Sequence, residues 1–238
     1  MTPMKNWVSG IILLAGSSRR YGGDKPKQFL NLGGKPLYRH AYGTFQNSSL
    51  FSEIILVCPV DELSIIKAAC PSAIVVAGGK TRQESSYNGL MACHKNCKIA
   101  LIHDAARPFV SRQILEENIT KAAKYGAVDT CIPAVDTMVI ENEGVISEMP
   151  DRRHCFSGQT PQTFQYDLIV KAHQSTCGRE VTDDCSLVHA MGAKVSIVNG
   201  DRLNFKVTTA FDFQVAEMLL ERADETEMGS GIAPTIDR

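Results

Sequence analysis

Residues 8–29 read VSGIILLAGSSRRYGGDKPKQF, and this stretch decides the fold. Its first part, residues 8–14, is a short apolar run that predicts a buried strand. The chain then turns through small residues, which let backbone N–H groups approach phosphate oxygens, and meets Arg and Lys side chains between residues 19 and 27. Cations at the carboxyl end of a first strand stand where open α/β sheets bind ligands. We therefore expect a polyphosphate site here, in preference to an ordinary turn with solvated cations.

The loop matches neither of the two familiar phosphate-binding patterns. A Walker loop requires G-x-x-x-x-G-K-[ST], and no such spacing follows Gly16. The dinucleotide fingerprint G-x-G-x-x-G fails as well, because Ser18 stands where the second glycine belongs. The loop thus indicates phosphate binding without placing the chain in either class.

The composition is that of a cytoplasmic globular enzyme. The chain has 238 residues, of which 44% are hydrophobic and 21% charged, which is enough for one sizeable α/β domain. A net charge of −1 argues against binding to nucleic acid or to an anionic membrane, so an anionic ligand must meet a local cluster of cations. No apolar run reaches the length of a membrane span. We do not expect residues 7–16 to be a signal-peptide core, because Arg19 and Arg20 follow them at once and the run is already expected to form the first strand.

The cysteines and histidines point to no metal or nucleophile site. The 8 cysteines form no C-x-x-C pair. Only Cys93 and Cys97 form a tight group, and no further ligands stand at a zinc-binding spacing from them. None of the 6 histidines stands in an obvious nucleophile–base arrangement. We expect free, buried thiols in a reducing cytosol.

Strand-like and helical patterns alternate along the chain. Strands are expected at residues 8–14, 53–57, 73–77, 99–103, 130–135 and 194–198. Helices are expected at residues 36–45, 61–69, 81–94, 111–125, 165–176, 184–191 and 210–223. Asp61 and Ser111 are the expected N-caps of the second and fourth helices. This rhythm predicts an α/β fold with a doubly wound, mostly parallel, Rossmann-like sheet.

The pattern breaks at residues 136–149, which are polar and rich in turn formers around Asn142-Glu143-Gly144. Such a segment predicts a two-stranded arm that projects from the domain. The domain itself is expected to span residues 1–225, with residues 136–158 as the arm region. Residues 226–238 are polar and are expected to be a disordered tail.

Several short segments together resemble one enzyme family. They are L-A-G-x-x-x-R and P-K-Q (residues 14–28), G-G-x-x-R-x-x-S (78–85), H-D-A-A-R-P (103–108), D-T (136–137), D-R (151–152), T-P-Q (160–162) and N-x-K-V-T (204–208). From Ile11 to Leu220 the chain resembles the 2-C-methyl-D-erythritol 4-phosphate cytidylyltransferases, which are nucleotidyltransferases with a glycosyltransferase-A-like fold. Many members have G-x-G ahead of the first arginine, and Ser18 departs from that pattern.

The resemblance implies that CMP is transferred from CTP to 2-C-methyl-D-erythritol 4-phosphate, with release of pyrophosphate, in the non-mevalonate isoprenoid pathway. The acceptor phosphate has a second pKa of about 6, so it is mostly dianionic at neutral pH and attacks the α-phosphorus in line without a general base. By the same match, Arg20 and Lys27 are the catalytic cations that stabilise charge in the transition state. The implied nucleotide-binding residues are Leu14, Ala15, Gly16, Ser17, Ser18, Gly79, Lys80, Ser85 and Asp104. The implied acceptor-binding residues are Arg107, Thr137, Arg152, Thr160 and Lys206.

A metal ion and a second subunit are also implied. Asp104, a carboxylate beside a triphosphate, is the expected ligand of Mg²⁺. In the family the arm crosses to the other subunit of a homodimer, which here would carry Thr137 and Arg152 to the partner's acceptor site. Apolar side chains on the arm favour its burial in such a dimer: Met138, Val139, Ile140, Val145 and Ile146.

Alternative interpretations stay open at several positions. Thr81 is also suited to be the N-cap of a plain strand-to-helix turn, and Asp104 to form a surface pair with Arg107. Residues 182–184 predict a helix N-cap with favourable dipole placement.

Two other functions remain possible. A ribitol 5-phosphate cytidylyltransferase is favoured by residues 158–161, whereas Ala106 and residues 184–186 favour the methylerythritol enzyme. A regulatory module that binds nucleotide without catalysis is the other, and the presence of both Arg20 and Lys27 counts against it.

Overall fold

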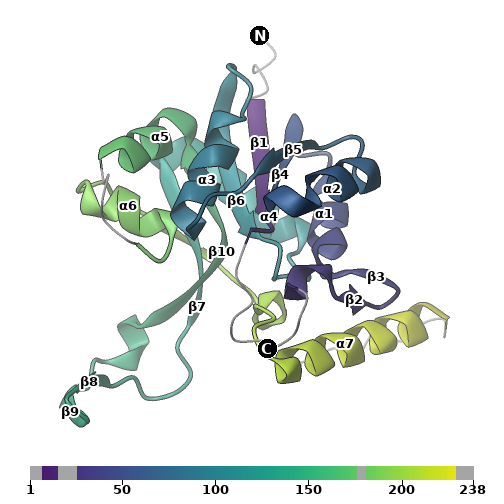
Figure 1. Ribbon diagram of the computed structural model, residues 1–238. Helices are drawn as coiled ribbons and strands as arrows, with labels where there is room; N and C mark the ends of the chain where they lie inside the picture. The colour runs from purple at the N-terminus through teal and green to yellow at the C-terminus, as the bar shows by residue number, and fades with distance from the viewer. Residues whose placement is uncertain (1–6, 16–25, 176–180, 229–238) are drawn as a thin grey trace.

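The computed structural model describes residues 7–15, 26–175 and 181–228, the last six of these by their backbone alone. A seven-stranded sheet lies at its centre, with the strand order β11-β7-β10-β6-β1-β4-β5 (Figure 1). The strands are β1 (Trp7–Leu13), β4 (Glu53–Cys58), β5 (Ile74–Ala77), β6 (Cys97–Asp104), β7 (Ala127–Pro133), β10 (Phe156–Gln165) and β11 (Ser196–Asn199). β10 runs antiparallel to β6 and β7, and all other neighbours are parallel. The expected α/β fold with a mostly parallel sheet is confirmed.

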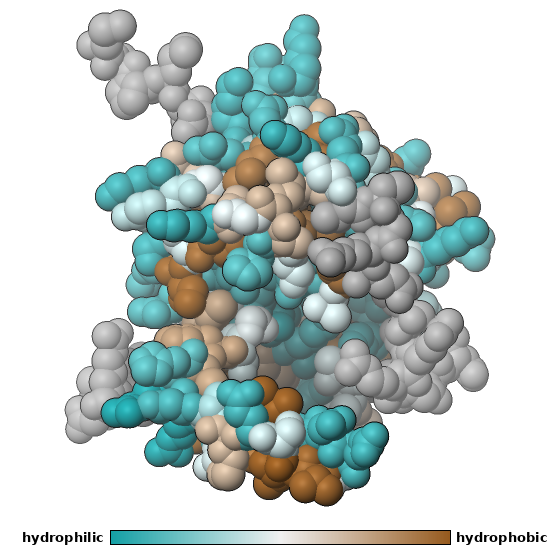
Figure 2. Space-filling view, turned by 90° about the vertical axis from the view of Figure 1, so that its left-hand side faces the viewer, coloured by the Kyte–Doolittle hydropathy of each residue, from teal (hydrophilic) through white to brown (hydrophobic). Residues whose placement is uncertain are grey.

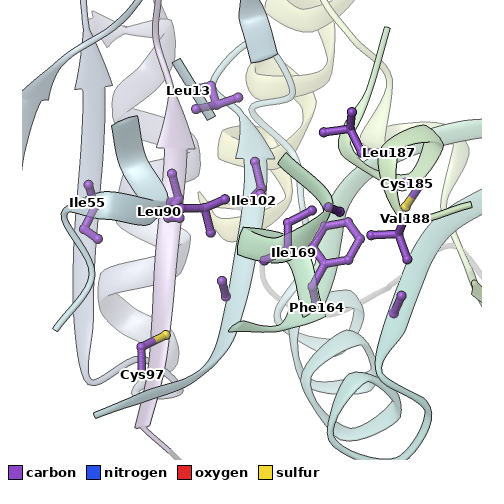
Figure 3. Packing of buried hydrophobic residues seen from close by; sticks show 14 of the residues in the cluster. Leu13, Ile55, Leu90, Cys97, Ile102, Phe164, Ile169, Cys185, Leu187 and Val188 are labelled. Atoms are coloured by element: carbon purple, nitrogen blue, oxygen red, sulfur yellow. The ribbon is translucent and has the colours of Figure 1, made fainter. Parts of the chain in front are cut away.

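Helices cover both faces of the sheet, because successive strand residues point to opposite sides. Ile11 and Leu13 of β1 pack into one hydrophobic cluster, while Ile12 of β1 and Leu14, which follows the strand, pack into another. The first cluster includes residues of α3 (Arg82–Met91), α5 (Tyr166–Ser175) and α6 (Asp184–Ala190), and Figure 3 shows part of it. The second includes residues of α1 (Leu37–Ser48), α2 (Leu63–Ala69) and α4 (Arg112–Tyr125). The sheet is therefore doubly wound, as predicted.

Helix ends follow the predicted capping chemistry, with one exception. The side chains of Thr81 and Ser111 accept backbone N–H bonds at the starts of α3 and α4. Asp61 was expected to cap a helix over residues 61–69, and that prediction is wrong. Asp61 lies within the short 3-10 helix η2 (Val60–Glu62), and α2 begins only at Leu63 with no side-chain cap.

Three strands were not predicted, namely β10 and the two short strands of a hairpin. β10 contains Gly158 and Pro161, which are turn formers, and buried polar residues that interrupt an apolar pattern. The short strands β2 (Asn31–Leu32) and β3 (Lys35–Pro36) form a hairpin, so α1 starts at Leu37 rather than at Pro36.

The C-terminal helix is longer than predicted. It follows the 3-10 helix η4 (Arg202–Asn204) as α7 (Ala210–Met228), and it continues past the expected end at residue 223. It also enters the segment from residue 226 onward that was expected to be disordered, and residues 229–238 lie outside the described residues.

A separate hairpin occupies the segment expected to be an arm. β8 (Ile140–Asn142) and β9 (Val145–Glu148) pair antiparallel, and the turn between them has positive φ at Glu143 and Gly144. Every residue of the two strands is exposed, and the hairpin lies away from the seven-stranded sheet in Figure 1. Figure 2 views this side of the molecule and shows hydrophobic surface at its lower end. The exposed apolar residues of the arm region, residues 136–158, are Met138, Val139, Ile140, Val145, Ile146, Met149 and Phe156, and Val135 is exposed just before it.

Two remaining expectations concern cysteines and membranes. The seven cysteines within the described residues are free thiols, and Cys177 lies outside those residues. Five of the seven are buried as expected, whereas Cys93 and Cys155 are partly exposed. Within the same part of the chain, no helix has the length and apolar character needed to cross a bilayer.

Candidate active site

A cleft of about 710 Å³ lies at the carboxyl ends of β1, β5 and β6. These strands share one edge of the sheet because β1 pairs in parallel with β4 and β6, and β4 with β5. Seven of the predicted site residues line the cleft: Leu14, Ala15, Lys27, Gly79, Lys80, Asp104 and Lys206. Lys27 comes from the 3-10 helix η1 (Lys27–Phe29), and Gln28 ties this helix to β1 by donating from Nε2 to the carbonyl of Leu14. Predicted residues from five separate segments are thus brought together.

The glycine turn between β5 and α3 forms one wall of the cleft. A Cβ atom on Gly78 would lie 2.3 Å from the Cβ of Ala15, and one on Gly79 would lie 2.3 Å from the Cβ of Glu84. Side chains are therefore excluded at both positions, and the backbone itself faces the cleft. Lys80 adds a cation to the wall, and its backbone N–H donates to Glu84 Oε2 at 2.6 Å.

Ser85 supports this turn from beneath. Its hydroxyl accepts from the N–H of Gly79 at 3.1 Å and donates to the carbonyl of Thr81 at 2.8 Å. The residue is fully buried, and it does not line the cleft. The structure therefore places Ser85 behind the glycine turn, where it fixes the backbone of that turn.

Asp104 lies at the end of β6 and holds two cations. Its Oδ2 is 2.6 Å from Lys206 Nζ, and its Oδ1 is 3.3 Å from Arg82 Nε. Burial alone raises the pKa of the Asp104 carboxyl, but the charges of Arg82 and Lys206 outweigh this effect and hold that pKa well below its ordinary value. Asp104 is therefore ionised in the cleft at neutral pH.

Arg107 does not form the surface pair with Asp104 that was one open interpretation. Its Nη1 donates to the carbonyl of Asn204 at 2.8 Å, and its Nη2 to the carbonyl of Gly158 at 3.5 Å. Asn204 is itself buried and donates from Nδ2 to the carbonyl of Thr160 at 2.8 Å. Arg107 thus braces the start of β10 and the backbone just before Lys206.

Thr160 is also directed inward. Its hydroxyl oxygen accepts from the N–H of Asp104 at 3.0 Å and lies 3.0 Å from His103 Nδ1. Because His103 Nε2 is 3.0 Å from the carbonyl of Arg107, which only accepts, Nε2 carries the hydrogen and Nδ1 accepts from Thr160. Burial lowers the pKa of His103 to about 4, so the ring is neutral at physiological pH. Thr160 and His103 together fix the backbone that presents Asp104.

The remaining predicted residues lie away from the cleft or outside the described residues. Thr137 and Arg152 are exposed and do not line the cleft, and Arg152 Nη1 donates to the carbonyl of Val135 at 3.0 Å. Gly16, Ser17, Ser18 and Arg20 lie outside the described residues. A second cavity, of about 540 Å³, lies between α1 and the start of α4 and contains none of the predicted residues.

Sequence reasoning also missed the contact between Arg82 and Asp184. Arg82 Nη1 is 2.7 Å from Asp184 Oδ2, a contact between residues 102 positions apart. The segment 182–184 was interpreted as a helix cap, and this holds for Asp183, which accepts from the N–H of Ser186 at 2.7 Å. Asp184 instead faces α3. The G-G-x-x-R-x-x-S segment contained Arg82, but no local pattern indicated its partner.

The acidic residues present limit what metal site this cleft can form. Asp104 is the one carboxylate among its described lining residues, and no group of three or more His, Cys, Asp or Glu side chains occurs in the described part of the chain. These residues do not build a cage from protein ligands alone. Mg²⁺ often binds through one or two carboxylates together with substrate phosphates, and Asp104 fits that role.

Comparison with known proteins gives a consistent result. A family model described as 2-C-methyl-D-erythritol 4-phosphate cytidylyltransferase matches residues 8–222. The protein of that name from Alkaliphilus oremlandii is 38% identical over 228 residues, covering 92% of this chain and 97% of the relative. The one from Clostridioides difficile is 37% identical over 230 residues, covering 93% and 97%.

Solved structures agree in fold. The crystal structure of 4-diphosphocytidyl-2C-methyl-D-erythritol synthase from Anaerococcus prevotii superposes with a TM-score of 0.83 at 29% identity, covering 92% of this chain and 97% of that one. That of 2-C-methyl-D-erythritol 4-phosphate cytidylyltransferase from Thermus thermophilus has a TM-score of 0.74 at 30% identity, covering 89% and 98%.

Proposed function

The chain belongs to the 2-C-methyl-D-erythritol 4-phosphate cytidylyltransferase family, and from this membership we propose which of its residues bind the substrates and promote the reaction. It transfers CMP from CTP to 2-C-methyl-D-erythritol 4-phosphate, forming 4-diphosphocytidyl-2-C-methyl-D-erythritol and pyrophosphate, in isoprenoid biosynthesis. The alternatives of a ribitol 5-phosphate cytidylyltransferase and of an inactive nucleotide-binding module are not favoured, because the family model and the relatives bear the methylerythritol enzyme's name.

The nucleotide occupies the cleft with its base against the glycine turn. This placement is supported by the two positions at which a Cβ atom would clash, which leave the backbone of residues 78–80 bare toward the cleft. Backbone N–H and C=O groups can distinguish the cytosine amino group from the uracil carbonyl. Ser85 contributes by holding the N–H of Gly79, which sets the position of that backbone edge.

The triphosphate lies over the loop that follows β1. Lys27 lines the cleft on this side, and Arg20, outside the described residues, belongs to the same loop. We assign both cations to the α-phosphoryl group. Charge builds there on the equatorial and leaving oxygens during in-line attack, so fixed cations stabilise the transition state more than the bound substrates.

Asp104 is proposed to hold a phosphate-bound Mg²⁺ ion. Its carboxylate is ionised and faces the cleft, which is the ligand chemistry that this ion takes. When bound, such an ion neutralises phosphate oxygens and orients them. His103 and Thr160 support Asp104 indirectly, because they hold the backbone that carries it.

Lys206 is proposed to receive the phosphate of the acceptor. Its ammonium group lies 2.6 Å from Asp104, which keeps it at the cleft with a third of its side chain exposed. An ammonium group has three donors, so it can bind Asp104 and a phosphate oxygen at the same time. Arg107 and Thr160 are assigned to supporting positions, because Arg107 Nη1 and Nη2 donate to backbone carbonyls and the Thr160 hydroxyl is bound to the Asp104 backbone and to His103.

A homodimer completes the acceptor site in this proposal. Thr137 and Arg152 are exposed on their own subunit and lie outside the cleft lining. The hairpin beside them exposes apolar side chains, and a two-stranded ribbon needs a packing partner in water. A closed twofold pair would bury both hairpins and bring each Arg152 to the other subunit's acceptor phosphate.

One observation carries the proposed function most directly. Lys27, the glycine turn, Asp104 and Lys206 come from distant parts of the chain and line a single cleft. The test is pyrophosphate release with CTP and a panel of sugar-alcohol phosphates. Turnover is expected with methylerythritol phosphate, and higher turnover with ribitol 5-phosphate would overturn the acceptor assignment.

The crossed arm is tested by mixing two inactive variants, Arg20→Ala and Arg152→Ala. If the arm acts in the partner, heterodimers contain one site with both defects and one with neither, so about a quarter of all sites in a random mixture regain activity. If the arm acts on its own subunit, no intact site forms. Arg153→Ala is the matched control, because Arg153 is an exposed neighbour that pairs with Asp151. Verified subunit exchange without recovery would exclude the crossed arm.

A further inference from the structure

Asp184 is a buried carboxylate that the reaction scheme above does not use. It is the first residue of α6, and only 1% of its side chain is exposed. Burial of a charge is costly unless the charge is paired, so a fully buried carboxylate indicates a specific set of partners. Capping of α6 does not account for Asp184, because Asp183 already performs that role.

The partners of Asp184 come from three other elements. Its Oδ1 accepts from Ser86 Oγ of α3 at 2.6 Å and from His173 Nε2 of α5 at 3.0 Å. Its backbone N–H donates to Gln162 Oε1 of β10 at 3.0 Å. These contacts lie among α3, α5 and α6, which cover the same face of the sheet (Figure 1). The carboxylate is therefore held in one orientation by the fold.

The other carboxylate oxygen of Asp184, Oδ2, is directed toward Arg82, which lines the cleft. Asp184 Oδ2 is 2.7 Å from Arg82 Nη1, and Arg82 Nε is 3.3 Å from Asp104 Oδ1. The third nitrogen, Nη2, is buried and has no hydrogen-bond partner within the described residues. Within the described residues, Asp104 and Asp184 are thus the two polar groups that hold the Arg82 guanidinium. Removal of the Asp184 charge would leave Arg82 held only by Asp104, the group that it has to position.

We infer that Asp184 is a positioning residue for cytidylyl transfer, acting through Arg82 to fix the Asp104 carboxylate and the first turn of α3 beside the nucleotide. Asp104 has two cationic neighbours, and Lys206 is the one that the acceptor phosphate engages in the function proposed above, on which this inference rests. Arg82 is the neighbour that stays in place during the reaction. The orientation of the Arg82 side chain is set by the buried Asp184 carboxylate and not by the substrates.

The test is a double-variant cycle on kcat with Asp184→Asn and Arg82→Gln. Displacement of a reacting group by about 1 Å costs up to about a hundredfold, so each single variant is expected to lower kcat between about tenfold and a hundredfold. KM for CTP is expected to change by less than about threefold, because the glycine turn and the phosphate-binding cations are retained. If Asp184 acts only through Arg82, the double variant loses no more than Arg82→Gln alone.

Asp183→Ala is the matched control. It removes the N-cap of the same helix, and so destabilises α6, without touching Arg82. Its kcat is expected to equal that of the wild type, although the protein is expected to be less stable.

Three results would overturn the inference. They are a folded Asp184→Asn protein with wild-type kcat, a double variant whose loss is the product of the two single losses, and a loss of kcat in Asp183→Ala equal to that in Asp184→Asn. If Asp184→Asn does not fold, the kcat of Arg82→Gln is the test on its own. A wild-type kcat in Arg82→Gln then excludes a positioning role for Asp184 through Arg82. Failure of the proposed function is separate, since the wild-type protein would then release no pyrophosphate from CTP and methylerythritol phosphate.

Discussion

Lowering the pH from 7 to 5 is expected to destabilise the protein through His103. The ring is completely buried, with Nε2 donating to the carbonyl of Arg107 and Nδ1 accepting from Thr160. Protonation would add a hydrogen to Nδ1 and reverse the bond to Thr160, in a place where water cannot solvate the new charge. Burial accordingly lowers the pKa of His103 from 6.5 to about 4.

The direction and the size of the change in the free energy of unfolding follow from the His103 pKa in the unfolded chain and in the folded protein. The unfolded chain takes up a proton as the pH falls through 6.5, whereas the folded protein does so only near pH 4. The unfolded state therefore binds more protons between these values, so the free energy of unfolding decreases as the pH falls and levels off below pH 4. Integration of the linkage relation gives a loss of about 2 kcal/mol at pH 5 relative to pH 7.

Urea unfolding of the wild type and of His103→Gln at pH 7, 6 and 5 measures this contribution. The variant lacks the titrating ring, so its disadvantage at pH 7 is expected to shrink by about 2 kcal/mol at pH 5. Other titrating groups cancel in the difference between the two proteins. His154→Gln is the control, because the His154 side chain is 85% exposed. The difference in unfolding free energy between the wild type and His154→Gln is expected to be the same at all three pH values. A difference between wild type and His103→Gln that stays constant within about 0.5 kcal/mol from pH 7 to 5 would refute the reasoning.

Two further predictions concern the reaction. Lys27→Ala and Arg20→Ala are each expected to lower kcat by an amount comparable to the loss of an oxyanion donor, about 3 kcal/mol, with much smaller effects on CTP binding. Lys98→Ala, which removes an exposed lysine near the opposite end of β6, serves as the control, and near-normal turnover in either cleft variant would disprove the assigned roles. CTP is expected to be used in strong preference to UTP, because a backbone edge fitted to the cytosine amino group leaves polar groups unpaired with uracil. Equal initial rates of pyrophosphate release from the two nucleotides would contradict this.

Most of the fold was predictable because its strands and helices bury apolar residues with regular spacing. The strand β10 was not, and the reason is the chemistry of its buried residues. Thr163 donates to Asn118 Oδ1, and the carbonyl of Pro161 accepts from Thr130, so positions that look solvent-facing in sequence lie in the interior. Buried hydrogen-bonded residues carry no apolar signal, so periodicity alone cannot identify such a strand.

The location of the candidate site was predictable from the sequence, but the orientations of its side chains were not. The places where β1, β5 and β6 end indicated where ligand-binding residues would gather, since parallel strands share one edge. The directions of individual side chains could not be derived in this way. Ser85 and Thr160 turn their hydroxyls toward the backbone behind the cleft, and Arg82 meets a carboxylate 102 residues further along the chain. These contacts depend on packing between elements, which no local motif encodes.

The charge distribution explains how a nearly neutral protein can bind two polyanions. The chain has a net charge of −1, yet the described lining of the cleft contains four cations and a single carboxylate: Lys27, Lys80, Arg82 and Lys206, with Asp104. The Asp104 charge is matched by Arg82 on its inner side, and Arg82 is in turn matched by Asp184 in the interior. The described lining therefore carries more positive than negative charge, which produces a local positive field at the cleft. That field favours CTP and a phosphate monoester over neutral analogues, and it is confined to the place where both anions must approach each other.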